Sequence, residues 1–521
     1  MHLPTSVSPH RQLFILLVAF VWLGGWSLGA EARGNPGKAR HIILFVGDGM
    51  QLEHEIATSR YLYGKAHQLS FHRLDYKTSM ATWDVNTYNK YAGILGVPAF
   101  EPTGFHPLVG YDPKRGGKKP HPLQKSGISD SYFLARISGT IPASDSAATA
   151  TAWATGFKTD AGNLAWLSGD PPGGALTTIA ELLREQKGYA IGVVSTVPFS
   201  DATPAAFVSH NPKRSNYHEI GSEIIRTVKP EVVIGGGFPG TAGFKYISEA
   251  DYRYLKGDAA SPYVFVERET AVDGTRSLLT AAQAAMKQGR KLFGLYGGRE
   301  GNFESPVSHD FPGTPLVTRA TIVDPTLRDA TLAALTILSH DPDGFFVMIE
   351  QGDIDWANHA NDYQRMIGAV WDLHEAVQCA IDYINRPGDD IDWTNTLVIV
   401  TADHGTSYMR LNDSRPLAAG DLPTQVAGYP CSYAGEKQCI HYPDGEVTYA
   451  SADHTNELVM VYAHGASGRP ALAPYEGSWY PGSRIIDNTQ LHQVMTSAAG
   501  IRTHPTLTPA DKKPCPRLKL H

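Results

Sequence analysis

Residues 41–48 read HIILFVGD, an unbroken apolar run that ends on glycine and aspartate. A run of this kind is typical of a strand that is buried on both faces of a parallel sheet. Two further runs end on acids or histidines, FFVMIE at 345–350 and TLVIVTADH at 396–404, and His454 precedes a fourth run, ELVMVY at 457–462. Because an open α/β sheet places its site at the carboxyl ends of its strands, these polar residues are expected to lie together.

Strand-like runs alternate with helical patterns along most of the chain. This order predicts an α/β fold with a doubly wound, mostly parallel central sheet flanked by helices. The strands are expected at 41–47, 189–195, 231–235, 291–296, 345–350, 396–402 and 457–463, and the helices at 146–155, 177–187, 217–228, 279–287, 327–339 and 360–385.

Three long stretches interrupt this alternation and are interpreted as insertions. They lie near 84–140, 236–276 and 405–453 and are rich in turn-forming residues. Long irregular segments in a compact domain are usually functional lids, interface elements or mobile loops. Surface decoration is the alternative for the first two, whereas the third leads into His454 and is expected to lie close to the site.

Length and charge favour one large domain with no role in nucleic-acid binding. A chain of 521 residues would allow about three domains of roughly 150 residues. The candidate site residues, however, run from Asp48 to His454 and must meet in space, so residues 33–521 are expected to form a single domain with insertions. The formal net charge of −7 gives no electrostatic case for a nucleic-acid-binding surface.

Residues 1–32 have the pattern of an export signal. Arg11 lies in a basic N-terminal region, and the apolar run at 13–25 is too short to span a bilayer comfortably. Cleavage after Ala30 or Ala32 would release an exported protein, periplasmic or secreted, without a membrane span. An uncleaved membrane anchor is the alternative.

The four cysteines predict few disulfides. Cys431 and Cys439 bracket the polar stretch SYAGEKQ, which suits a local disulfide in an oxidising compartment. Cys379 falls in a helical pattern and is expected to pack in the core, and Cys515 lies in a basic tail. The fold is therefore expected to depend on its core and not on covalent cross-links.

Several polar residues allow both a structural and a chemical interpretation. Ser146 follows Asp145 at the start of a helical pattern, where a serine is commonly a helix cap. It could also be a nucleophile, because a helix N-terminus presents free N–H groups to an anion. Asp355 and His359 lie four residues apart and are either a surface pair on a helix or two metal ligands. On these residues alone, both alternatives stay open.

Six segments resemble motifs of the alkaline phosphatase family, in order and at family-like spacing through nearly all of residues 33–521. They are VGDGM at 46–50, DSAATATAWATGFKT at 145–159, DATPAAFVSHNPKR at 201–214, EQGDIDWANH at 350–359, TADHG at 401–405 and ADHT at 452–455. The resemblance implies a secreted or periplasmic phosphomonoesterase with two zinc ions and one magnesium ion. It also implies small-molecule phosphate monoesters as substrates and a homodimer as the assembly to test.

The resemblance further implies a role for each site residue. Ser146 would be the nucleophile, and Arg214 would clamp two phosphate oxygens in a bidentate manner. The zinc ligands would be Asp355, His359 and His454 for one ion and Asp48, Asp403 and His404 for the other, since zinc accepts mixed nitrogen and oxygen sets. Magnesium prefers oxygen and would take it from Asp48, Thr203 and Glu350, with Asp201 nearby.

Two positions depart from some members of that family. Asp201 stands where some animal enzymes carry histidine, and Trp356 stands at a substrate-facing position where others carry lysine or histidine. An indole ring brings no positive charge to a phosphate. Weaker inhibition by phosphate than in lysine-bearing relatives is therefore expected, and the preference of the third metal site is open.

Two other functions compete with this interpretation. A phosphodiesterase or nucleotide pyrophosphatase of the same superfamily would keep the paired zinc ligands, but it would need neither the third metal site nor Arg214. A catalytically inactive exported protein that binds metal or phosphate is the second alternative. The intact Ser146 and the complete ligand set argue against it.

Overall fold

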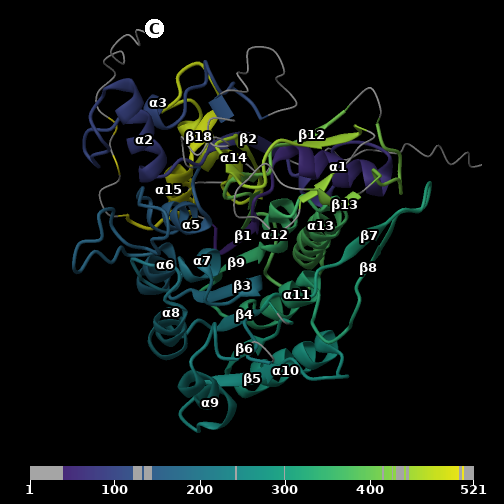
Figure 1. Ribbon diagram of the computed structural model, residues 1–521. Helices are drawn as coiled ribbons and strands as arrows, with labels where there is room; N and C mark the ends of the chain where they lie inside the picture. The colour runs from purple at the N-terminus through teal and green to yellow at the C-terminus, as the bar shows by residue number, and fades with distance from the viewer. Residues whose placement is uncertain are drawn as a thin grey trace, which may run out of the picture. The chain divides into compact units, whose positions relative to one another are not determined.

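A computed structural model describes residues 39–120, 132–133, 143–240, 243–298, 300–412, 416–424, 426–429, 439–441, 445–503, 507 and 509. Its centre is a ten-stranded sheet with helices on both faces (Figure 1), which confirms the predicted fold class. The strands, in spatial order, are β18 (Ile485–Asp487), β2 (Tyr76–Ala81), β17 (Val459–Gly465), β10 (Thr396–Thr401), β1 (His41–Gly47), β9 (Phe345–Gln351), β3 (Ala190–Pro198), β4 (Val232–Gly236), β6 (Lys291–Leu295) and β5 (Tyr263–Glu267).

The sheet is parallel except at one strand. β1 lies between β10 and β9 and pairs with both in parallel, and the parallel order continues from β9 to β5. β17 runs antiparallel to β10 and to β2. All seven residues of β1 are buried, as its unbroken apolar run predicts for a central strand covered on both faces.

Two groups of helices cover the sheet. On one face lie α1 (Leu52–Tyr63), α10 (Gly274–Gln288), α11 (Leu327–Leu338) and α13 (Tyr363–Asn385). On the other lie α5 (Ser146–Thr155), α6 (Ile179–Lys187), α7 (Ala202–Ala205) and α15 (Asn488–Ala499). In Figure 1 the two groups flank the strands, which is the doubly wound arrangement.

The structure corrects the prediction of an irregular insertion at 236–276. This stretch contains α9 (Glu249–Gly257) and β5, and β5 is the edge strand of the main sheet. Its Gly-rich start hid the alternation of strand and helix. The helix expected at 217–228 is also divided, because α8 (Tyr217–Ser222) is followed by a π-helical turn, η2 (Glu223–Val228).

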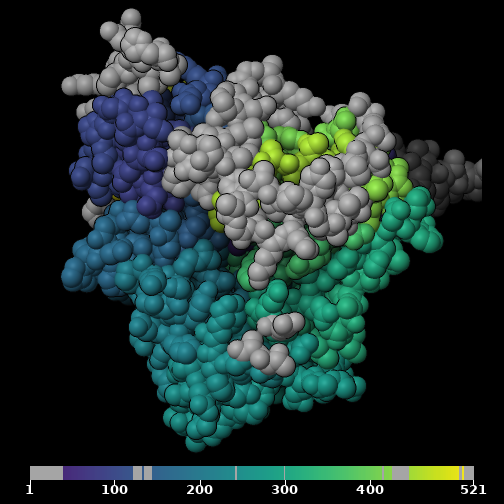
Figure 2. Space-filling view, in the orientation of Figure 1, coloured from purple at the N-terminus to yellow at the C-terminus, as the bar shows by residue number. Residues whose placement is uncertain are grey.

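The described part of the early insertion has an aromatic core of its own. It contains α2 (Val85–Leu95) and α3 (Pro107–Gly110). Tyr88 and Tyr91 of α2 lie in one aromatic cluster with Trp83, which follows β2, and with Tyr480 near the C-terminal end. In Figure 2 the purple-to-blue surface of this insertion adjoins the blue-to-teal surface of the segments that carry α5 to α8. The insertion is therefore a packed layer beside the helix that begins at Ser146, and the Val85 N–H donates to the Thr159 carbonyl at 3.0 Å.

Candidate active site

The site forms where the central strands end. Asp48 follows β1, Glu350 is the penultimate residue of β9, and Asp403 and His404 follow β10. Since these three strands are adjacent and parallel, their carboxyl ends bring the four side chains to one edge of the sheet. The structure thus places these polar residues close together at the ends of the strands.

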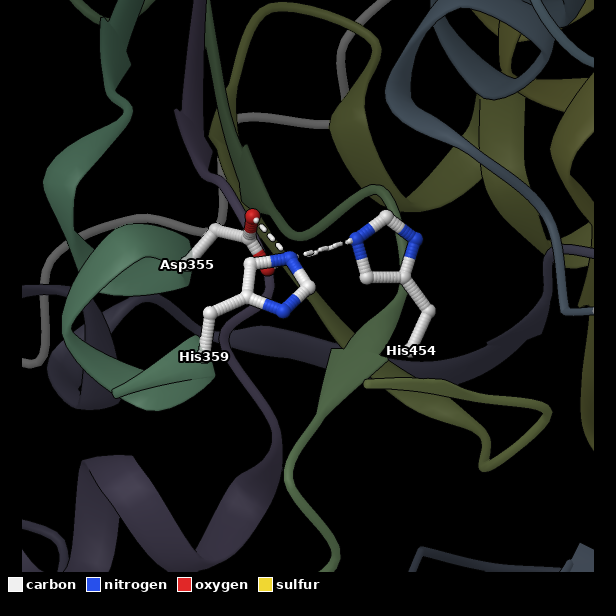
Figure 3. A group of neighbouring side chains, drawn as sticks. All are labelled: Asp355, His359 and His454. Carbon is white, nitrogen blue, oxygen red and sulfur yellow. Dashed lines mark hydrogen bonds and ion pairs between the residues drawn. The ribbon is translucent and has the colours of Figure 1, made fainter. Parts of the chain in front are cut away.

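Asp355, His359 and His454 form the first candidate metal group (Figure 3). Their nearest nitrogen and oxygen atoms all lie within 4.8 Å of one another. His359 Nε2 lies 3.0 Å from Asp355 Oδ2 and 3.1 Å from His454 Nε2. The i, i+4 spacing places Asp355 and His359 on one face of the short helix α12 (Asp353–His359).

Backbone carbonyls orient both imidazole rings of this group. His359 Nδ1 lies 2.6 Å from the Ala452 carbonyl oxygen, and His454 Nδ1 lies 3.1 Å from that of Ser144. Because a carbonyl only accepts a hydrogen bond, each Nδ1 must carry the proton and donate it. The Nε2 lone pairs then face the centre of the group, which is the arrangement that metal-binding histidines adopt.

Asp48, Asp403 and His404 form the second candidate metal group, and all three are buried. His404 Nε2 lies 3.2 Å from Asp403 Oδ2 and 3.5 Å from Asp48 Oδ1. The other oxygen of Asp403 accepts a hydrogen bond from the Gly49 N–H at 2.9 Å. The two groups therefore have the nitrogen and oxygen donors of two neighbouring cation sites.

A third set beside Asp48 consists of oxygen atoms only. Asp48 Oδ1, Thr203 Oγ1 and Glu350 Oε1 are buried and make no hydrogen bond of acceptable geometry with any described residue. The second oxygen of Glu350 accepts a hydrogen bond from Ser195 Oγ at 2.5 Å. Buried oxygens without partners are costly, so this set is suited to a hard cation.

The electrostatics of the site require positive charge. Burial raises the pKa of Asp48 well above its ordinary value, and the Asp403 and Asp355 carboxylates raise it further. Burial likewise raises the pKa of Glu350 to about 8. Clustered buried carboxylates stay ionised at neutral pH only if cations compensate them.

Ser146 is the first residue of α5 and lies between the second metal group and the pocket. Its Oγ is 3.4 Å from Asp48 Oδ2 and 3.4 Å from His404 Nε2. Asp145 caps the helix through a hydrogen bond from the Ala148 N–H at 2.9 Å. Because Asp145 fills the capping role, the side chain of Ser146 is left for another one, which decides against the interpretation of Ser146 as a cap.

Arg214 faces the same pocket and is fixed by two carboxylates. Its guanidinium donates to Asp145 Oδ2 and to Asp201 Oδ1, each at 3.1 Å. Burial alone would lower the pKa of Arg214, but Asp201 and Asp145 outweigh it and raise the pKa. Asp201 therefore lies in the pocket as predicted, with one of its carboxylate oxygens engaged by Arg214.

Most of these residues face one cavity of about 410 Å³. It is lined by Asp48, Ser146, Val197, Asp201, Ala202, Thr203, Arg214, Glu350, Asp355, Trp356, His359 and His454. A serine, an arginine and the donors of several cations therefore surround one small space. Such a space suits an oxyanion with several negatively charged oxygens.

The family model for alkaline phosphatase matches residues 129–418. This chain belongs to the alkaline phosphatase family. Alkaline phosphatase H of Pseudomonas aeruginosa is 31% identical, over 73% of this chain and 78% of the relative. An alkaline phosphatase of Escherichia fergusonii is 28% identical, over 91% of this chain and 88% of the relative. The chain is thus a phosphatase enzyme.

A solved structure agrees with the fold. It is a variant of the alkaline phosphatase from the Antarctic bacterium TAB5, with magnesium bound in its M3 site. The TM-score is 0.55 at 19% identity, and the match covers 90% of this chain and 100% of that one. At this identity the likeness concerns the fold alone.

Thr406 supports the site of this alkaline phosphatase, although no motif in the sequence pointed to it. Thr406 Oγ1 donates to Asp355 Oδ1 at 2.6 Å, and Thr406 pairs with His454 between β11 (Gly405–Thr406) and β16 (His454–Thr455). This short ladder carries His454 to the metal groups. The TADHG and ADHT motifs predicted the ligands but not the pairing between their strands.

Other predictions meet the structure to different extents. Cys379 is buried in α13 as expected. Residues 1–32, Cys431 and Cys515 lie outside the described residues, and so does the side chain of Cys439, so the predicted signal and disulfide stay predictions. Among the described residues, every helix is too short or too polar to cross a bilayer.

Proposed function

We propose that this chain hydrolyses phosphate monoesters through a phosphoserine at Ser146, in a site that binds two zinc ions and one magnesium ion. The observation that carries the proposal is the position of Ser146. Its hydroxyl lies at a helix N-terminus, 3.4 Å from one donor atom each of Asp48 and His404, in a pocket that also contains Arg214. A nucleophile, an anion clamp and cation ligands are the parts that phosphoryl transfer needs.

The donor sets support the assignment of the metals. Asp355, His359 and His454 would hold one zinc ion, and Asp48, Asp403 and His404 the other. The oxygens of Asp48, Thr203 and Glu350 would hold magnesium, which prefers oxygen ligands. When bound, these ions would neutralise the anionic substrate and lower the pKa of the attacking hydroxyl groups.

The side chains of the pocket account for the remaining steps. Ser146 Oγ attacks phosphorus, the bond to the ester oxygen breaks, and the alcohol leaves. Water then attacks the phosphoserine, the bond from phosphorus to Ser146 Oγ breaks, and inorganic phosphate is released. Throughout, Arg214 pairs with two non-bridging oxygens, and its position is fixed by Asp145 and Asp201.

Arg214 also favours monoesters over diesters. A monoester presents three non-bridging oxygens, so two can pair with a bidentate guanidinium while the third faces the proposed metal sites. A diester has only two non-bridging oxygens and gains less from this clamp. The oxygen set at Thr203 and Glu350 would hold a third cation, which would match the higher charge of a monoester.

The first test compares a chromogenic phosphomonoester with the matching diester at alkaline pH. We expect fast hydrolysis of the monoester, loss of activity after chelation, and recovery with zinc plus magnesium. Ser146→Ala is the matched control, and we expect it to lose turnover and the burst of product while it still binds the metals. A preference for the diester, or full turnover by Ser146→Ala, would overturn the proposal.

We further propose that residues 1–32 are an export signal and that the mature protein is a periplasmic or secreted homodimer. The apolar run at 13–25 and the small residues up to Ala32 support the signal. N-terminal sequencing of the exported protein should find a start near Glu31 or Arg33. A retained apolar segment would contradict the cleaved export signal. A monomeric mass in solution would contradict the homodimer.

A further inference from the structure

His210 lies in the segment that carries Arg214, and carboxylates enclose it on two sides. Its Nδ1 lies 2.8 Å from Glu223 Oε1, and its backbone N–H donates to Glu223 Oε2 at 2.9 Å. Its Nε2 lies 3.1 Å from the Leu176 carbonyl oxygen and 3.3 Å from Glu181 Oε2. We call His210, Glu181 and Glu223 the His210 clamp.

The geometry fixes the charge of the His210 ring. Both ring nitrogens face atoms that only accept hydrogen bonds, so both must carry a proton, and the ring is an imidazolium. Burial alone would lower the pKa of His210, but Glu181 and Glu223 outweigh it and raise the pKa to about 10. Burial would raise the pKa of Glu181, yet the hydrogen bond from His210 helps to lower it.

The His210 clamp connects two helical elements to the Arg214 segment. Glu181 is on α6, where it also closes a capping box with Thr178. Glu223 is the first residue of the π-helical turn η2. π-Helical turns are rare and often lie at functional sites. The charged groups that face the ring therefore come from α6 and from η2.

Backbone hydrogen bonds link the same segment to the loop that follows α5. Asn211 and Leu164 exchange two of them, at 2.8 and 2.9 Å, and the Arg214 N–H donates to the Gly162 carbonyl at 2.8 Å. The Gly162 N–H in turn donates to Asp145 Oδ2 at 3.0 Å, next to Ser146. The segment is thus tied to α5 on one side and, through His210, to α6 and η2 on the other.

We propose that His210 is a positioning residue for phosphate binding, which holds the segment of Arg214 in place as a cation between Glu181 and Glu223. The inference rests on the proposed function, because it takes Arg214 as the group that binds phosphate. A cation between two carboxylates resists displacement more than a neutral side chain with one hydrogen bond would. A small displacement of the Arg214 guanidinium is sufficient to weaken oxyanion binding.

The test measures the dissociation constant of inorganic phosphate by calorimetry on the metal-loaded protein. We expect His210→Gln to weaken phosphate binding about tenfold, because glutamine cannot donate to both carboxylates. Glu223→Gln is a second variant that keeps the shape of the His210 clamp. We expect it to weaken phosphate binding as well, but less than His210→Gln does. His218→Gln is the matched control, since His218 is a nearby exposed histidine that contacts the Phe244 carbonyl and lies outside the clamp.

A double-mutant cycle with Arg214→Ala separates positioning from general stabilisation. If His210 acts through Arg214, His210→Gln should change phosphate binding less than twofold in the Arg214→Ala background. An equal effect in both backgrounds would overturn the inference. So would a His210→Gln protein with a lowered melting temperature but unchanged phosphate affinity.

The failure of the proposed function would look different. A wild-type protein that binds phosphate but hydrolyses no monoester would contradict the enzymatic proposal, while the calorimetry would still decide the role of His210. A wild-type protein that binds no phosphate would overturn both.

Discussion

At the residue scale, Asp145 connects the helix that begins at Ser146 with Arg214. One oxygen caps α5 through the Ala148 N–H, and the other accepts from Gly162 and from Arg214. Asp145, which precedes the proposed nucleophile Ser146, thereby fixes both the start of α5 and the guanidinium of Arg214. A single carboxylate thus contacts both the first turn of the helix that carries Ser146 and the guanidinium of Arg214.

We expect Trp356 to determine how tightly the pocket holds phosphate after the reaction. It lines the same cavity as Ser146 and Arg214 but contributes no charge. We expect Trp356→Lys to tighten inhibition by inorganic phosphate about tenfold, or about 1.4 kcal/mol, because an ammonium group would face the dianion. The inhibition constant at pH 7.5 checks this, since the lysine is then charged.

Trp356→Phe is the control for loss of the indole without gain of charge. Its inhibition constant should stay close to that of the wild type. If Trp356→Lys changes the phosphate inhibition constant less than twofold, the side chain at this position does not face the bound phosphate. The proposed role of Trp356 in substrate binding would then be wrong.

At the element scale, the sequence predicted the seven strands from β17 to β6 of the sheet order and missed β18, β2 and β5. β1, β9 and β10 are buried on both faces, so their pattern is unmistakable. β2 reads YKTSMA and mixes polar with apolar residues, and β18 has only three residues. These two strands depend on their neighbours for pairing, which a local pattern cannot reveal.

The same limit applies to the candidate site. The candidate ligands at the strand ends and Ser146 could be identified from the sequence, because strand order and family motifs fix their positions in the chain. The partners of His210 were not, because Glu181 and Glu223 belong to other elements and meet the histidine only through tertiary packing. The charge of that ring likewise depends on groups distant in the sequence.

The approach of α13 to the start of β7 (Val307–His309) leads to a prediction about packing. A Cβ on Gly368 would lie 1.9 Å from the Pro306 carbonyl oxygen. We expect Gly368→Ala to destabilise the protein by about 1–3 kcal/mol, because this clash with backbone outweighs a gain in helix propensity of about 1 kcal/mol. The melting temperature of the metal-loaded protein measures the effect.

Gly93 provides the matched control for this substitution. It lies within α2 and is exposed, and a Cβ there would meet nothing within 4 Å. Gly93→Ala should therefore leave stability unchanged or raise it by up to about 1 kcal/mol. A Gly368→Ala protein as stable as Gly93→Ala would show that the α13 contact can relax without cost.

At the scale of the whole molecule, the site brings together residues that are far apart in the sequence. Its candidate ligands come from Asp48 near the start of the described residues to His454 near their end, and they meet only when β1, β9 and β10 are paired. The proposed metal binding would therefore be coupled to the pairing of these strands. Ions that bind the folded state alone add their binding free energy to its stability.

This coupling predicts how pH affects the stability of the metal-free protein. Without cations, the buried Asp48 and Glu350 favour protonation, and burial raises the pKa of Glu350 from 4.5 to about 8. Because the pKa in the folded state is above that in the unfolded state, this contribution is complete below pH 4.5 and is lost as pH rises through 8. The melting temperature of the metal-free protein should therefore fall between pH 6 and pH 9.

The metal-loaded protein should not show this fall, because cations replace the protons and keep the carboxylates ionised. The difference in melting temperature between loaded and metal-free protein should consequently widen with pH. Metal-free protein prepared by dialysis avoids the pH dependence of a chelator, and metal-free Glu350→Gln, whose amide does not titrate, should show a smaller fall. A difference that stays constant from pH 6 to pH 9 would mean that the carboxylates are compensated by groups other than the metals.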